Sequence, residues 1–159
     1  MTSRASIAGH PIHPMLVVFP IGLFIFSFVS DLIHLASRDP IWIDVAYYTM
    51  AGGIIGALAA AVPGLIDVFS IADTHVRRIG LTHMTINLGV VVLYVVNLWL
   101  RSGPRDLTLP MWLSGVSVVL LAVSGWLGGE MVYVHGVGVG SPPQSERAGA
   151  RMRPSTSRR

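Results

Sequence analysis

Four of the six histidines border long apolar stretches: His10, His13, His83 and His135. If these stretches cross a bilayer as helices, threading the chain through it brings all four histidines to the same membrane face. An ionisable side chain at membrane depth costs roughly 2.5 to 3.5 kcal/mol on insertion scales, so a group of them predicts a functional site. The chemistry open to it is metal ligation, haem ligation or proton transfer.

The absence of cysteine narrows the ligand classes. It excludes disulfides, thiolate-bound zinc, cysteine-ligated iron–sulfur clusters and covalent attachment of haem. Two ligands suit imidazoles without thiols. One is a b-type haem held by histidines from two helices, and the other is one divalent metal ion with mixed histidine and carboxylate ligands.

The segment Gly9-His10-Pro11-Ile12-His13-Pro14 is the most specific local signal. A residue before proline favours extended geometry, so we expect a stiff elbow in which the two imidazoles lie about 9 Å apart. Only one of them then ligates. His13 and His83 are the preferred ligands, with His10 and His135 as further candidates.

Other residues at the same level are assigned supporting roles. Carboxylates and amides orient the far nitrogen of a ligating imidazole, and arginines pair with haem propionates. The candidates for the first role are Asp67, Glu130 and Asn87, and those for the second are Arg77 and Arg78. The opposite face offers a poorer polar site made of Asp31, His34 and Asn97, with too few histidines for a second haem.

The elements that must position these residues are four apolar runs in a chain of 159 residues that is 52% hydrophobic and only 12% charged. Runs of about 20 apolar residues match a hydrocarbon core of about 30 Å. We therefore predict an all-α bundle of four transmembrane helices, near 14–36, 44–70, 79–101 and 108–134. Polar rows on the first and third helices face inward, and the spans show no internal repeat.

Small residues on the second and fourth helices predict close helix packing, at Gly52 with Gly56 and at Gly125 with Gly129. The same glycine faces offer a surface for a homodimer. Residues 1–13 are assigned to the elbow, 14–136 to the membrane domain and 137–159 to a disordered, arginine-rich tail.

All 11 positive charges are arginine, and the sequence pI is about 10.0. Their placement favours a membrane over nucleic acid, because eight lie on the side of the termini and three on the other. The positive-inside rule then predicts a multi-pass protein of the cell (inner) membrane with both termini in the cytoplasm.

Several segments together resemble the family called domain of unknown function 2231. They are the Gly9–Pro14 opening, Pro63-Gly64-Leu65-Ile66-Asp67, His83 with Asn87, and the stretch from Ser124 to Glu130 followed by Tyr133 and His135. The resemblance covers about residues 8 to 139 and implies a four-helix bacterial membrane protein. Some such relatives are joined to Rieske-type iron–sulfur domains, whereas this chain carries no Rieske sequence.

The leading hypothesis is a haem- or metal-binding protein that passes electrons from a membrane donor such as quinol to a separate redox protein. It is a redox subunit or anchor rather than a stand-alone enzyme. Two alternatives stay open: a small proton or cation transporter, and a structural or assembly subunit of a membrane complex.

Overall fold

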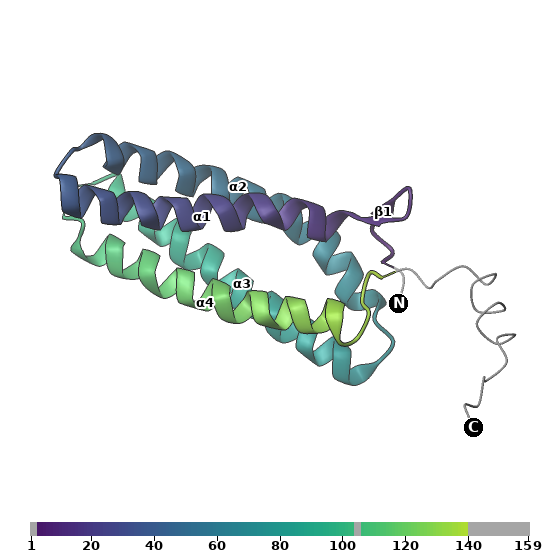
Figure 1. Ribbon diagram of the computed structural model, residues 1–159. Helices are drawn as coiled ribbons and strands as arrows, with labels where there is room; N and C mark the ends of the chain where they lie inside the picture. The colour runs from purple at the N-terminus through teal and green to yellow at the C-terminus, as the bar shows by residue number, and fades with distance from the viewer. Residues whose placement is uncertain (1–2, 104–105, 140–159) are drawn as a thin grey trace, which may run out of the picture.

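The computed structural model describes residues 3–103 and 106–139. Four antiparallel helices form the bundle: α1 (Ile12–Ser37), α2 (Ile41–Ser70), α3 (Thr74–Arg101) and α4 (Thr108–Tyr133). All four are long and apolar enough to cross a membrane. The all-α four-helix prediction is confirmed, and the described ends of the chain lie at one end of the bundle (Figure 1).

Three helices begin earlier than their hydropathy indicates, α1 by two residues and α2 and α3 by more. α2 begins at Ile41 rather than near 44, and α3 begins at Thr74 rather than near 79. The Asp73 carboxylate accepts hydrogen bonds from the backbone N–H groups of His75 and Val76, which caps α3 before its apolar part starts. The bonds from Val76 and His75 also lower the pKa of Asp73.

The N-terminal segment is a small hairpin rather than the polyproline elbow that its prolines predict. Strand β1 (Ser6–Ile7) pairs antiparallel with β2 (His10–Pro11). Ala8 and Gly9 between them adopt positive φ values of 50° and 80°, which close the tight turn. His10 therefore lies in a strand while His13 lies in the first turn of α1, so the two imidazoles are not on one extended segment.

Large apolar side chains cover the outside of the bundle, as expected of a surface that contacts lipid. Exposed aromatic residues lie near both ends of the helices: Trp99 and Trp112 at one end, Trp126 and Tyr133 at the other. Such residues settle at the two interfaces of a bilayer, so their positions fit a transmembrane orientation of the bundle.

The bundle consists of two helical hairpins, α1–α2 and α3–α4. Each hairpin is tightly packed, and the contacts between hairpins are sparser. In Figure 1 the purple and blue helices form one pair and the teal and green helices the other. α1 and α3 lie on a diagonal, and their inward side chains meet along the bundle axis.

The axial residues of the two hairpins occupy corresponding positions. Residues of α1 meet α3 residues numbered 70 higher: His13 with His83, Phe24 with Tyr94, and Asp31 with Arg101. In each pair one residue comes from the α1–α2 hairpin and the other from the α3–α4 hairpin. The pairs therefore define a pseudo-two-fold axis that runs along the bundle. The sequence shows no convincing internal repeat, and the correspondence lies in these axial contacts.

The partner helices obey the same relation. Ser27 donates to the Ala46 carbonyl, and Asn97, 70 positions later, donates to the Pro110 carbonyl. A second pair of carbonyls, those of Ala60 and Ser124, accepts hydrogen bonds from His13 and His83, the two histidines on the bundle axis. Ala46 and Pro110 are as far apart in the sequence as Ala60 and Ser124, and in each pair the first residue lies on α2 and the second on α4.

The end of α4 continues into an ordered turn. Val137 donates its backbone N–H to the Met131 carbonyl at 2.9 Å and packs against the cluster of Val68, Ile71 and Val76. Residues 140–159, most of the segment predicted to be a disordered tail, lie outside the described part of the chain.

Candidate functional site

His13 lies in the first turn of α1 and reaches across to α2. Its Nδ1 lies 2.8 Å from the Ala60 carbonyl oxygen, so Nδ1 carries the proton and donates it. A Cβ added at Gly64 would lie 2.7 Å from that Nδ1 atom. The imidazole therefore occupies the space that only a glycine leaves, next to Pro63 in α2.

His83 repeats this arrangement in the second hairpin. Its Nδ1 lies 2.8 Å from the Ser124 carbonyl oxygen of α4 and 2.9 Å from Ser124 Oγ, and its Cε1 would lie 3.3 Å from a Cβ at Gly128. Asn87, one turn further along α3, places its Nδ2 3.1 Å from His83 Nε2. Nε2 is then the acceptor nitrogen, and the ring is the neutral Nδ1–H tautomer.

The two imidazoles face each other across the bundle axis. Their ring centroids are 6.3 Å apart, and their planes are nearly perpendicular at 87°. With each Nδ1 bound to a carbonyl, Nε2 is the ring nitrogen that an external ligand would take, and in His83 that ligand would replace the contact with Asn87. Metal-ligating histidines bind in this way, with the far N–H held by a carbonyl or a carboxylate.

The other two predicted ligands lie apart from this pair. His10 is exposed, and its Nδ1 lies 3.1 Å from the Ala8 carbonyl in the hairpin turn. His135 pairs with His75 instead, with 5.8 Å between ring centroids, and its Nε2 lies 4.0 Å from a Glu130 oxygen. Within residues 3–103 and 106–139, no three His, Asp or Glu side chains converge as a metal site.

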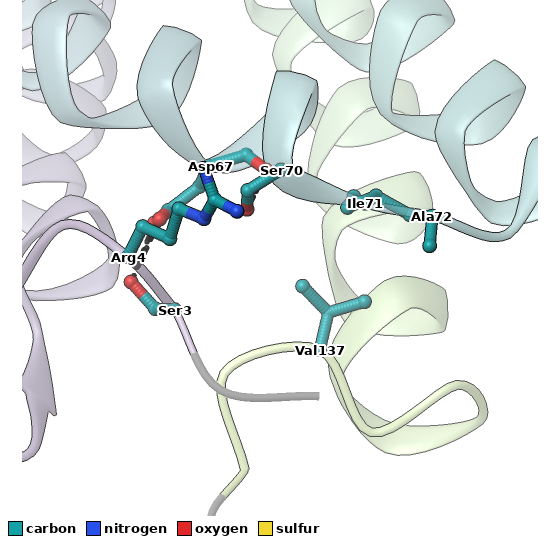
Figure 2. Close-up of a pocket in the computed structure, with 7 residues that line it drawn as sticks. All are labelled: Ser3, Arg4, Asp67, Ser70, Ile71, Ala72 and Val137. Carbon is teal, nitrogen blue, oxygen red and sulfur yellow. Dashed lines mark hydrogen bonds between the residues drawn. The ribbon is translucent and has the colours of Figure 1, made fainter.

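Asp67 binds the N-terminal segment. Its carboxylate accepts hydrogen bonds from the Ser3 hydroxyl at 2.8 and 2.9 Å and from the Ala5 backbone N–H at 3.1 Å. Figure 2 shows this contact at the wall of a cavity of about 330 Å³, which Val137 closes from the other side. The sequence predicted that Asp67 and Glu130 orient the ligating imidazoles. In the structure, backbone carbonyls bind Nδ1 of His13 and of His83 instead.

Arg77 and Arg78, the predicted propionate partners, are both exposed on α3. They lie six and five residues before His83, so at 100° per residue neither shares the face of its imidazole. Their pairing with a propionate stays a prediction.

The opposite end of the axis holds a buried ion pair. Arg101 donates through two nitrogens to the two oxygens of Asp31, at 2.8 and 2.7 Å, and both side chains are at most 2% exposed. Arg101 Nε also donates to Asn97 Oδ1, and Asn97 donates to the Ser114 hydroxyl. His34 lies outside this network, with Nδ1 2.9 Å from the Asp39 carbonyl.

An aromatic stack separates the two polar ends. The rings of Phe24 and Tyr94 lie parallel, with 3.9 Å between centroids and 3° between planes. Gly53 makes room for Phe24, because a Cβ there would lie 2.6 Å from the ring. The axis thus carries a histidine pair, an apolar middle and an ion pair.

The sequence placed Asp31, Asn97, His13, His83 and Asn87 on inward faces. It also indicated inward rows that contain their partners but did not assign those partners to a site: Ser124, Arg101 and Ser114. Their spacing on α3 and α4 carried a signal, since Arg101 continues the polar row of α3 and the two serines lie on one row of α4.

Fold and site together define a four-helix integral membrane protein whose interior holds a histidine pair near one end and an ion pair near the other. A family model described as "Predicted membrane protein (DUF2231)" matches residues 9–141. The chain belongs to this family, which confirms the resemblance seen in its motifs. No curated protein and no solved structure matches it.

Proposed function

We propose that this protein is a membrane electron-transfer protein in which His13 and His83 hold one b-type haem. The observation that carries the proposal is the pair itself: two imidazoles from different hairpins, each with Nδ1–H bound to a backbone carbonyl at 2.8 Å. Each ring would then bind iron through its Nε2 atom. When bound, haem supplies a one-electron carrier at this membrane face.

The number of ligands favours haem over a bare ion. A zinc or similar ion needs three or four protein ligands, whereas a haem iron takes two axial imidazoles. The described residues offer two imidazoles here and no group of three His, Asp or Glu side chains. Iron bonds of about 2 Å require about 4 Å between the ligating nitrogens, which rings with centroids 6.3 Å apart reach when their Nε2 atoms face each other.

The porphyrin needs space between the hairpins. The two cavities described, near Asp67 and near Trp99, do not lie between the rings. Binding therefore requires side chains to part at this level, along the sparser contacts between the hairpins. The Nδ1 bonds to the Ala60 and Ser124 carbonyls would hold each imidazole against its own hairpin, in the space beside Gly64 and Gly128.

The test is an absorption spectrum of protein purified in detergent from haem-replete cells, with haem quantified by extraction. We expect a Soret band at one haem per chain, lost in His13→Ala and in His83→Ala. His75→Ala and His34→Ala are matched controls that keep the band, because neither residue lies at the axis. Colourless wild-type protein, or haem retained without His13 and His83, contradicts the proposal.

A structural role for the pair is the second candidate, because its hydrogen bonds to carbonyls also join the helices of each hairpin. It predicts colourless wild-type protein and a lower unfolding temperature in both alanine variants. Transport along the axis is less favoured, since a path would have to open the aromatic stack and the Asp31–Arg101 pair. Quinol as donor and a separate redox protein as acceptor belong to the haem proposal as its expected partners.

A further inference from the structure

The two hairpins differ around their histidines, and we infer from this difference that Asn87 and Ser124 control access to the Nε2 atom of His83. The inference rests on the proposed haem site and concerns its regulation. On the His13 side, the residue one turn along α1 is Val17 and the carbonyl partner is Ala60. On the His83 side, the corresponding residues are Asn87 and Ser124.

The side-chain nitrogen of Asn87 has more acceptor atoms around it than it has hydrogens to donate. Its Nδ2 lies 2.6 Å from Ser124 Oγ, 2.9 Å from the His83 carbonyl oxygen and 3.1 Å from His83 Nε2. An amide nitrogen carries two hydrogens, so it serves two of these three acceptors at a time. The longest of the three contacts is the one to Nε2.

This surplus makes the bond to Nε2 exchangeable. With no ligand bound, the amide donates to Nε2 and keeps that half-buried acceptor paired. When a ligand takes Nε2, both hydrogens turn to Ser124 Oγ and the His83 carbonyl, so no donor is left unpaired. The ring itself stays in place, because its Nδ1 remains on the Ser124 carbonyl.

Substitutions of Asn87 and Ser124 should change the ligand affinity of His83 in opposite directions. Asn87→Val copies the residue of the first hairpin and removes the competing donor, so a ligand binds Nε2 more tightly. Ser124→Ala copies Ala60 and removes the alternative acceptor. When a ligand takes Nε2 in this variant, one N–H of the Asn87 amide has no acceptor, so the ligand binds more weakly. In the double variant no amide competes for Nε2, and the backbone carbonyl at position 124 still holds Nδ1, so the affinity stays close to that of Asn87→Val although the contact of Ser124 Oγ with Nδ1 is lost.

The experiment is a titration of haem-free protein in detergent with haemin, followed at the Soret band. We expect about fivefold tighter binding for Asn87→Val and about fivefold weaker binding for Ser124→Ala, the effect of one hydrogen bond. Val17→Asn is the matched control. It places an amide beside His13 where no serine follows, and it weakens binding as Ser124→Ala does.

A second measurement needs no haem. In protein labelled with ¹⁵N-histidine, the Nε2 resonance of His83 should move toward that of an unbonded acceptor in Asn87→Val and stay near its place in Ser124→Ala. Affinities that fall in both variants, or an Nε2 resonance unmoved by Asn87→Val, overturn the inference. If wild-type protein binds no haemin, the proposed function fails, while the resonance still decides whether Asn87 holds Nε2.

Discussion

Asp31 and Arg101 join the two hairpins by a two-pronged ion pair in the interior of the bundle. Removing one partner leaves the other as an unpaired buried charge, which costs about 3 to 5 kcal/mol, whereas replacing both by apolar residues is often close to neutral. We expect Asp31→Leu or Arg101→Met alone to lower the free energy of unfolding by that amount.

The double variant Asp31→Leu/Arg101→Met should recover most of this loss. Chemical denaturation in mixed micelles measures all three, with Asp44→Asn, at an exposed position of α2, as the control. Equal destabilisation by the single and double variants would show that packing, not the unpaired charge, sets the cost.

Ser117 carries a buried hydroxyl oxygen with no hydrogen-bond partner in the described part of the chain. An unpaired buried hydroxyl costs about 1 to 3 kcal/mol, so Ser117→Ala should raise the free energy of unfolding by about 1 kcal/mol. The same denaturation assay checks this change. Ser114→Ala is the contrasting variant, since its hydroxyl accepts from Asn97 and its loss should destabilise the bundle.

For single residues, the sequence identified which polar side chains face inward but not which side chains they bind. His13, His83, Asp31 and Asn97 are recognisable because a polar side chain in an apolar helix is costly unless it faces protein. Their pairing depends on how two helices are rotated against each other. That rotation is set by contacts such as Phe24 with Tyr94, which neither helix encodes alone.

The glycines of the helices fall into two classes that hydropathy does not separate. A Cβ at Gly64 would lie 2.7 Å from His13 Nδ1, whereas a Cβ at Gly89 would meet nothing within 4 Å. We expect Gly64→Ala to displace the imidazole, to cost about 1 to 3 kcal/mol and to abolish haem binding. Gly89→Ala should instead stabilise α3 by up to about 1 kcal/mol.

Unfolding curves and Soret intensity of these two variants provide the measurement. Haem binding by Gly64→Ala at wild-type affinity would mean that His13 has no fixed position on α2.

The prediction of close packing at paired glycines was correct for one helix and wrong for the other. Gly52 and Gly56 on α2 lie against Leu23 and Pro20 of α1, but Gly125 has nothing within 4 Å, and Gly129 approaches only Tyr133 of its own helix. The glycines of α4 that lie against other helices are Gly128, near His83, and Gly115, near Phe28, and the small-residue spacing identified neither of them. Spacing alone leaves the choice of face open, because every position of an apolar helix is compatible with lipid.

For the whole molecule, the arginine distribution predicts the orientation. We expect the α1–α2 connection outside the cell and the α2–α3 connection in the cytoplasm. The chain contains no cysteine, so single cysteines report without background. Asp39→Cys should react with a membrane-impermeant maleimide in intact cells, and Ala72→Cys only after permeabilisation. The reverse pattern would invert the assigned orientation.

The four spans could be predicted from length and hydropathy, whereas the internal repeat could not. Equivalent positions carry different residues: Phe24 and Tyr94, Ser27 and Asn97, Asp31 and Arg101. These residues keep corresponding places in the two hairpins although their side chains differ, and His13 with His83 is the one named pair of identical residues. A comparison of the two halves by residue identity therefore finds little similarity, although their axial residues occupy corresponding positions.

The equivalence of the two hairpins also bears on how such a protein can arise. A two-span unit starts and finishes on one side of the bilayer, so a tandem copy inserts with the same sidedness as the original. No redistribution of flanking charge is needed, in contrast to units with an odd number of crossings, whose second copy must insert upside down. A gene for one hairpin, working as a dimer, could thus be fused to itself and its two halves free to specialise without ever passing through a wrongly inserted ancestor.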